Sequence, residues 1–312
     1  MNYNKPDIHI KKVLVLYFSQ SGQLLEIVHS VLSPLRESEK TVLKFAEIKS
    51  LYPYPFPWSY YKFFDAFPES ALEIPDKIDK IDIHPEDDFD LIILAYQIWY
   101  LSPSVPISSF LQSKQAKRIM KGKPVVTIIG ARNMWLMAQE KVKKRLNDLG
   151  AKLIGNIVLV DRHKNLISIV TIVYWMMTGK KKRFIDIFPK PGVSNQDIKG
   201  AYRFGNVILD KLLNQDLDTL QTEIRSMGAV RVIPNLIMLE QRAEKIFKIW
   251  AMFIRRKGGY GNPDRKLRVK LFSVYLLVAI LFLSPIGYLN SKIRYLVNQE
   301  KLKKDIDYYS SI

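Results

Sequence analysis

A short run of hydroxyl and amide side chains, Ser19-Gln20-Ser21-Gly22-Gln23, follows an apolar segment and precedes a helical pattern that begins at Leu24. Hydroxyls, amides, free backbone N–H groups and a helix N-terminus together surround a phosphate group well. The run contains no lysine or arginine, and it has neither the GxxxxGK[ST] spacing of a P-loop nor a GxGxxG fingerprint. It predicts a phosphate site of neutral donors, which a bulky residue at Gly22 is expected to fill.

Two further segments follow apolar runs later in the chain. Residues 95–103 (AYQIWYLSP) supply aromatic rings to flank a flat ligand ring, although ordinary packing beneath a lid is the alternative. Residues 130–135 (GARNMW) begin with a glycine, which permits close backbone approach, and Arg132 is either a ligand residue or a salt-bridge residue at a helix start. The residues expected at the ring are Tyr96, Gln97, Ile98, Trp99, Tyr100, Gly130, Arg132, Asn133, Met134 and Trp135.

Five apolar runs predict the strands that position these segments. They span residues 12–18, 41–48, 89–95, 123–130 and 152–160, with helical patterns between several of them, for example over 24–32 and 136–149. Strands that alternate with helices predict an α/β fold with a doubly wound, five-stranded parallel sheet. Ligands bind such sheets at the carboxyl ends of the strands, where the strand order reverses. The three segments are therefore expected to meet at one edge.

Two stretches interrupt this alternation. Residues 51–75 hold five prolines and nine aromatic residues, a composition that predicts a long loop or lid. A second insertion spans residues 164–183, in which positions 165–179 carry no charge and are followed directly by Lys-Lys-Lys-Arg. An apolar helix that ends in a basic cluster is typical of an interfacial anchor, and a core or dimer helix is the alternative.

Charge divides the chain unevenly. Residues 1–150 contain 20 Lys and Arg against 17 Asp and Glu, whereas residues 151–312 contain 28 against 13. We expect residues 11–215 to form the sheet domain and residues 216–312 a cationic, mainly helical extension that associates with membranes. Residues 271–291 lack charge and have basic flanks, so we expect them to span a bilayer, to re-enter it or to form a core helix. Ser284, Pro285 and Gly287 favour a break in this helix near its end.

Residue counts exclude several kinds of site. The chain has no cysteine, which excludes disulfides, thiolate metal sites and a cysteine nucleophile, and its four histidines leave little room for a metal centre. We expect no metal site. Nucleic acid is not an expected partner, because only charge supports it and no recognised motif accompanies that charge. An anionic membrane surface is expected instead, and the polar N-terminus predicts a cytoplasmic protein at the inner face of the cell membrane.

Over roughly residues 11–215 the chain resembles the flavodoxin-like superfamily, whose members hold the phosphate of FMN in a neutral loop after the first strand. A narrower resemblance rests on KVLVLYFSQSGQL at 12–24, on YPFPW and FFDAFPES within 51–75, and on GARNMW. These segments resemble the flavodoxin-like proteins called dialkylresorcinol-condensing enzymes, which accompany aryl-polyene and flexirubin-type pigment pathways in Bacteroidetes-like bacteria. The resemblance implies FMN as cofactor, a lipid-like substrate and a ketosynthase as pathway partner.

The activity implied by this resemblance is an aromatase, which oxidises a 2,5-dialkylcyclohexane-1,3-dione to a dialkylresorcinol by removing two electrons and two protons. Candidate bases for the proton are Tyr96, Tyr100 and His163, with His84 as a weaker candidate in a surface turn. Alternatives are an NAD(P)H-dependent quinone or flavodoxin-type reductase, a non-enzymatic electron carrier and a non-catalytic partner of the ketosynthase. A homodimer is also compatible with the sequence.

Overall fold

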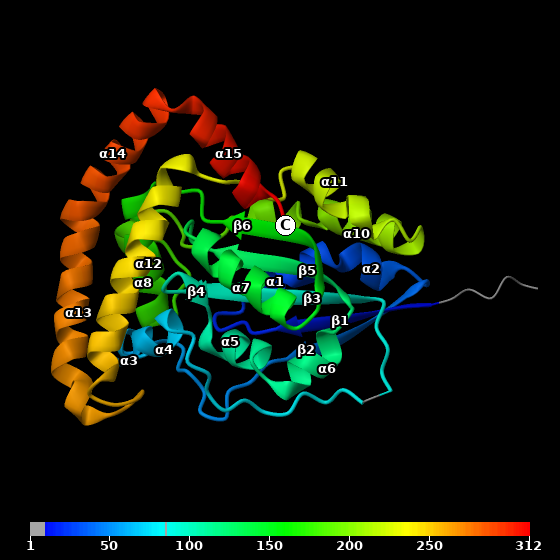
Figure 1. Ribbon diagram of the computed structural model, residues 1–312, viewed down its shortest axis with the longest axis horizontal. Helices are drawn as coiled ribbons and strands as arrows, with labels where there is room; N and C mark the ends of the chain where they lie inside the picture. The colour runs from blue at the N-terminus through cyan, green and yellow to red at the C-terminus, as the bar shows by residue number, and fades with distance from the viewer. Residues whose placement is uncertain (1–9, 85) are drawn as a thin grey trace, which may run out of the picture.

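Five parallel strands form the centre of the protein, whose computed structural model describes residues 10–84 and 86–312 (Figure 1). Hydrogen bonds join them in the order β2-β1-β3-β5-β6. Their bounds are β1 (Lys11–Tyr17), β2 (Thr41–Glu47), β3 (Leu91–Trp99), β5 (Pro124–Ala131) and β6 (Lys152–Val160). With the two-residue β4 (Ser102–Pro103) set aside, this is the order 2-1-3-4-5 of flavodoxin-like doubly wound sheets, so the predicted fold class is confirmed.

Burial explains why the sequence patterns predicted these strands well. The apolar side chains of β1 from Val13 to Leu16 and of β3 from Leu91 to Ala95 are fully buried, because helices cover both faces of the sheet. One face carries α1 (Gln23–Val31), α2 (Ser33–Glu37), α9 (Asn195–Lys199), α10 (Tyr202–Leu213) and α11 (Leu220–Ser226). The other carries α5 (Val105–Leu111), α6 (Lys114–Met120) and α7 (Leu136–Asp148) (Figure 1).

The end of β3 differs from the prediction. The strand continues to Trp99, so the segment from Tyr96 to Trp99 is strand and not loop, and its last residues pair with β4. The connecting residues Tyr100 and Leu101 have φ values of 49° and 62°. Two consecutive positive φ values are the geometry of a type I′ hairpin turn, which normally uses Asn-Gly. The Tyr-Leu sequence therefore gave no signal for this turn.

The two predicted insertions are both partly helical. The lid, residues 51–75, contains α3 (Tyr60–Asp65) and α4 (Phe67–Ala71), so the expectation of a continuous loop was wrong for residues 60–71. The Ser59 side chain caps α3 by accepting from the amide of Lys62, and proline occupies the first turn of α4, where its missing N–H has no consequence. The apolar segment of the second insertion forms α8 (Asn165–Thr178), followed by the short 3₁₀ helix η1 (Phe184–Asp186).

The chain after residue 216 is helical, as predicted, while the domain boundary itself stays a prediction. Its elements are η2 (Leu217–Thr219), α11, α12 (Pro234–Arg255), η3 (Pro263–Arg265), α13 (Lys266–Val278), the π-helical η4 (Ala279–Leu283), α14 (Ser284–Val297) and α15 (Gln299–Ser310). The helices α12, α13 and α14 run along one side of the sheet, and α15 returns towards β6 (Figure 1). In place of the predicted break, the backbone continues through η4 into α14. Among the described residues, no helix combines the length and the apolarity that crossing a membrane requires.

Candidate functional site

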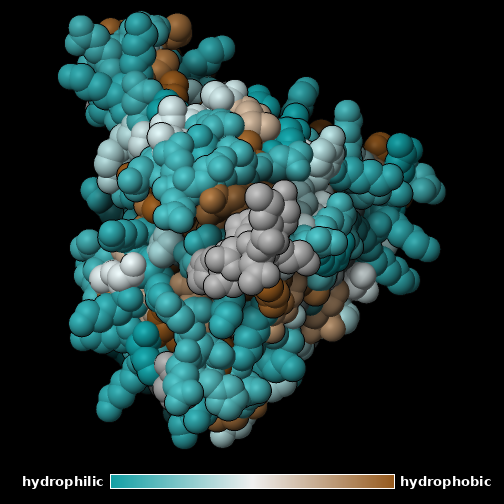
Figure 2. Space-filling view, turned by 90° about the vertical axis from the view of Figure 1, so that its right-hand side faces the viewer, coloured by the Kyte–Doolittle hydropathy of each residue, from teal (hydrophilic) through white to brown (hydrophobic). Residues whose placement is uncertain are grey.

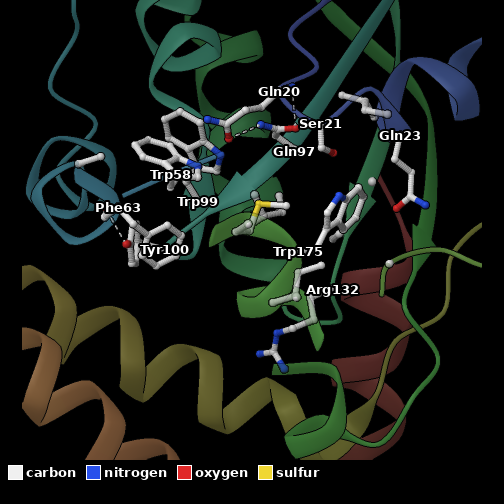
Figure 3. A pocket seen from close by; sticks show the side chains of 18 of the residues that line it. Gln20, Ser21, Gln23, Trp58, Phe63, Gln97, Trp99, Tyr100, Arg132 and Trp175 are labelled. Atoms are coloured by element: carbon white, nitrogen blue, oxygen red, sulfur yellow. Dashed lines mark hydrogen bonds between the residues drawn. The ribbon is translucent and has the colours of Figure 1, made fainter. Parts of the chain in front are cut away.

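A cavity of about 230 Å³ lies at the carboxyl ends of β1, β3 and β5, where the order of the strands reverses (Figure 3). The sheet edge contributes Gln20, Ser21, Gln23, Leu24, Ile27, Gln97, Ile98, Trp99, Tyr100, Gly130, Ala131 and Arg132 to its lining. The lid adds Trp58, Phe63 and Ala66, the second insertion adds Ile172, Trp175 and Met176, and the segment after it adds Gly192. The three predicted segments therefore converge on one cavity, as expected for ligand sites of doubly wound sheets.

The loop after β1 presents backbone amides at the start of α1. Gly22 is the N-cap of α1 with φ +84°, and no side chain caps this helix. Leu25 donates its amide to Ser19 Oγ at 3.3 Å, and Glu26 donates to the Gly22 carbonyl at 3.1 Å. Within the described part of the chain, no acceptor is recorded for the amides from Ser21 to Leu24. Unpaired amides at a positive helix end are suited to an anionic oxygen.

Gly22 has open space around it. A Cβ atom built there has no neighbour within 4 Å, so a methyl group meets no steric clash, and the expectation that a bulky residue fills the loop stays a prediction. The backbone conformation is the constraint, because φ +84° is strained for any residue with a side chain. Substitution at Gly22 therefore acts by redirecting the amides of the loop.

Gln23 closes the far side of this loop. Its side-chain amide donates to the carbonyl of Val193 at 3.0 Å, and its Oε1 accepts from the amide of Val193 at 3.0 Å. A Cβ on Gly192 would lie 2.4 Å from Gln23 Oε1 and 2.9 Å from the Trp175 ring. Gln23 is thus a tether that holds the segment after α8 against the loop, and Gly192 is required for that close approach.

Aromatic rings enclose the other end of the cavity. Trp58 and Trp99 pack edge to face with ring centroids 5.4 Å apart, and Phe63 lies 5.4 Å from Tyr100 (Figure 3). Gln97, on the same strand edge, accepts the amide of Gln20 at 3.3 Å. The faces of these aromatic rings suit a flat, apolar ligand ring.

Tyr96 belongs to the core and does not line the cavity. It is fully buried, its hydroxyl donates to Gln139 Oε1, and burial raises its pKa well above the usual value. Side chains alternate along a strand, so extending β3 past Ala95 turned Tyr96 away from its neighbour Gln97. The hypothesis that Tyr96 flanks a ring or acts as a base is therefore not supported by its position.

The end of β5 contributes Gly130 to the cavity and the loop after it contributes Arg132, whereas Asn133, Met134 and Trp135 are not part of its lining. The Arg132 guanidinium donates to the backbone and side-chain oxygens of Asn165, and its other Nη lies 3.3 Å from Met134 Sδ. Burial lowers the pKa of Arg132 to about 10, so it remains charged at neutral pH. Among the described residues Arg132 forms no salt bridge, and its hydrogen-bond partners Asn165 and Met134 are neutral.

None of the predicted bases presents a free acceptor to the cavity. The Tyr100 hydroxyl donates to the carbonyl of Phe63 at 2.7 Å, and burial raises its pKa well above the usual value. His163 is exposed and outside the lining, with Nδ1 2.6 Å from Asp161 Oδ1. His84 lies exposed in a surface turn. Among the described lining residues there is no aspartate, glutamate or histidine.

Sequence reasoning missed the contribution of the second insertion to the site. Trp175 is nearly completely buried, and Figure 3 draws it between Ser21 and Arg132. Lys181 stands 5.4 Å from the Trp175 ring centroid and 3.5 Å from Glu26 in the first turn of α1. A cation therefore approaches the neutral loop from a distant part of the chain. The Lys-Lys-Lys-Arg run was visible in the sequence, but its place beside α1 was not.

No family model matches the sequence, and no curated protein matches it either. Similar solved structures include a flavoprotein from Lactobacillus acidophilus in complex with FMN, which is 22% identical over 47% of this chain and 93% of that chain, with a TM-score of 0.38. A flavodoxin from the domain Archaea is 13% identical over 64% and 98% of the two chains, with a TM-score of 0.37. Oxidised flavodoxin 1 from Bacillus cereus is 15% identical over 63% and 95%, with a TM-score of 0.34.

The strand order β2-β1-β3-β5-β6 places the chain in the flavodoxin-like fold class. The narrower resemblance to dialkylresorcinol-condensing enzymes stays a prediction. The lid and α8 line part of the cavity, and the helices α12, α13 and α14 lie along one side of the sheet (Figure 1).

Proposed function

We propose that the protein binds FMN at the carboxyl ends of β1, β3 and β5 and oxidises an apolar, lipid-like substrate beside it. The observation that carries this proposal is the set of amides from Ser21 to Leu24, which have no recorded acceptor in the described chain and border an aromatic cavity. The phosphate of FMN fits these amides and the nearby ammonium of Lys181. The flavin ring of FMN fits between the tryptophan side chains that line the cavity and Gly130.

The size of the cavity sets a condition on this fit. Ligand pockets usually have volumes of about 300–1,000 Å³, which exceeds the roughly 230 Å³ present here. Trp175 and the rest of α8 must therefore move outwards when the cofactor enters.

The described lining residues include no aspartate, glutamate or histidine that could act as a base. The site therefore favours a substrate whose own C–H group is acidic. FMN, when bound, supplies a two-electron oxidant. A 2,5-dialkylcyclohexane-1,3-dione fits the remaining requirements, because its carbon acid forms an enolate without a strong protein base. The charged Arg132 guanidinium would hold the enolate oxygen, and Trp58, Phe63 and Met176 would contact the alkyl arms.

The proposed reaction is balanced with FMN as the oxidant. The dione loses one hydride to the oxidant and one proton to solvent, and tautomerisation then gives the dialkylresorcinol. The enzyme would act where such a product partitions, at the membrane surface on the cytoplasmic side. The class of reaction that supplies the dione is a ketosynthase-type condensation.

FMN titration of the apoprotein, followed by flavin fluorescence, tests the proposal. The Gly22→Ala variant is expected to weaken FMN binding at least tenfold, because φ +84° strains a side-chain-bearing residue and misdirects the amides. Gly122→Ala is the matched control, since Gly122 also has a positive φ (+75°) and open space around it but lies outside the cavity.

The outcomes separate the alternatives. Failure of the wild-type protein to bind FMN overturns the proposal, as does equal FMN affinity in Gly22→Ala and wild type. For a protein that binds FMN, anaerobic mixing with a dialkylcyclohexanedione should bleach the flavin. Bleaching by NAD(P)H alone, and not by the dione, would favour the quinone reductase instead.

A further inference from the structure

The outer side of the C-terminal helices carries an unusually apolar surface. We call the apolar residues of these helices that are at least one third exposed the outer stripe: Ile246, Ile249, Met252 and Phe253 on α12, Leu267, Leu271, Val274, Leu277 and Val278 on α13, Leu281 and Phe282 on η4, and Leu289, Ile293, Leu296 and Val297 on α14. Soluble proteins rarely expose so many adjacent apolar side chains, which therefore indicate a binding surface.

The charged residues around the outer stripe are almost all basic. Residues 245–297 contain eleven lysines and arginines and one acidic residue, Asp264. Lys266 and Lys270 are exposed on α13 between members of the stripe, and Arg256 and Lys257 are exposed just after α12. A surface that combines apolar side chains with basic ones is complementary to a bilayer that contains anionic phospholipid.

The side of the molecule opposite α13 and α14 does not share this pattern. Figure 2 shows that side, which is mainly hydrophilic and has only scattered apolar residues. The apolar exposure of the C-terminal helices is therefore not repeated on the opposite side.

We propose that the outer stripe docks the protein in the plane of an anionic membrane, without any segment crossing it. The absence of a helix long and apolar enough to span a bilayer, among the residues described, agrees with docking in the plane. Basic side chains would contact phosphate headgroups, while residues such as Leu271 and Phe282 enter the acyl boundary.

A second copy of the chain is the competing occupant, and the charge argues against it. In a two-fold symmetric dimer the same patch meets itself, so the basic residues around the stripe would face one another with almost no acidic partners. Like charges at an interface disfavour association, whereas anionic headgroups neutralise them.

The inner side of the same helices explains how the stripe stays exposed in water. Phe272 stacks on Phe67 of the lid with ring centroids 3.6 Å apart, and Val269 is buried beside it. Arg265, just before α13, is fully buried among acidic groups of the lid. These contacts fix α13 to the protein from within, which leaves its outer side free for the membrane.

Co-sedimentation with vesicles tests the docking surface, and the apoprotein is used so that the result does not depend on FMN. Wild type is expected to bind vesicles of phosphatidylcholine with 30% phosphatidylglycerol at least tenfold more tightly than pure phosphatidylcholine vesicles. The double variant Leu271→Asp and Val278→Asp should lose at least tenfold of that binding, since both side chains are about half exposed in the stripe.

The matched control places the same two charges elsewhere. The double variant Ile10→Asp and Tyr202→Asp changes two apolar residues of similar exposure, 46% and 52%, that lie outside the stripe. It should bind anionic vesicles almost as wild type does. The proposal is overturned if wild type does not sediment with anionic vesicles, or if both double variants bind equally well. A dimer in sedimentation velocity that only the Leu271/Val278 variant abolishes, without vesicle binding, overturns it in favour of self-association.

Discussion

The sheet and the C-terminal helices place apolar and charged residues in opposite ways. In β1 the side chains from Val13 to Leu16 have 0% exposure, whereas Leu267 on α13 and Phe282 on η4 are 68% and 65% exposed. Conversely, the contact between α13 and the lid contains a buried ion cluster in which Arg265 is 0% exposed, Asp65 1% and Glu69 6%.

The ion cluster holds α13 to the lid beside the apolar contact of Phe272 with Phe67. Arg265 Nε donates to Asp65 Oδ1 at 2.6 Å, and its two Nη groups donate to Glu69 at 2.8 and 2.9 Å. Arg255 adds a second cation 3.0 Å from Glu69 Oε1. The sheet is stabilised by apolar burial, whereas α13 is positioned by charged contacts together with a small apolar contact that includes Phe272 and Phe67, and its other apolar residues stay exposed.

The largest expected effect comes from breaking this cluster. Arg265→Met leaves Asp65 and Glu69 buried without their main cation, so the free energy of unfolding should fall by roughly 3–5 kcal/mol. Urea denaturation of the purified variant measures the change. The triple variant Asp65→Asn, Glu69→Gln, Arg265→Met should regain most of the loss, because no unpaired charge remains. Equal stability of Arg265→Met and wild type would show that the cluster does not hold α13 to the lid.

A smaller, pH-dependent effect is expected at Glu240 on α12. This residue is fully buried, its Oε2 accepts the amide of Met137 at 3.2 Å, and no hydrogen-bond partner for Oε1 is recorded in the described structure. Burial raises its pKa to about 8, despite the backbone amides at the start of α7 and the charge of Arg132.

The sign of the pH effect follows from this raised pKa. The unfolded chain releases the Glu240 proton near pH 4.3, but the folded protein keeps it until about pH 8. The contribution of Glu240 to the free energy of unfolding therefore falls as the pH rises between these two values. Glu240→Gln should therefore raise the melting temperature by several degrees at pH 9 and change it little below pH 4. Differential scanning fluorimetry measures both, and a difference independent of pH would contradict the buried carboxyl.

The smallest effects are expected at the sheet edge, from residues that sequence reasoning offered as bases. His163→Ala and Tyr100→Phe should each lower the rate of dione oxidation less than about threefold, because neither residue presents a free acceptor to the cavity. Loss of a true general base typically costs about 10²–10⁴-fold. Steady-state kinetics at saturating dione distinguish these values, and a hundredfold loss in either variant would restore that residue as the base.

Local patterns in the sequence predicted the sheet and part of the site. Continuous apolar runs such as that in β1 mark strands buried on both faces, because parallel strands lie between two layers of helices. The rule that ligands bind where strands end then predicted that Ser21, Gln97 and Arg132 would meet, and the structure brings them to one cavity. These predictions succeed because strand burial and loop position depend on short stretches of chain.

Tertiary structure alone decided what covers that site and what holds the outer helices. The pair Asp65 and Arg265 is separated by 200 residues, and no local pattern shows which charged residue will meet which. The same applies to Trp175 and Lys181, which reach the loop after β1 because Gln23 bonds to Val193, 170 residues further along. Sequence composition determined that apolar and basic residues abound after residue 216, whereas only packing against the lid decided which of them face inwards and which are left exposed.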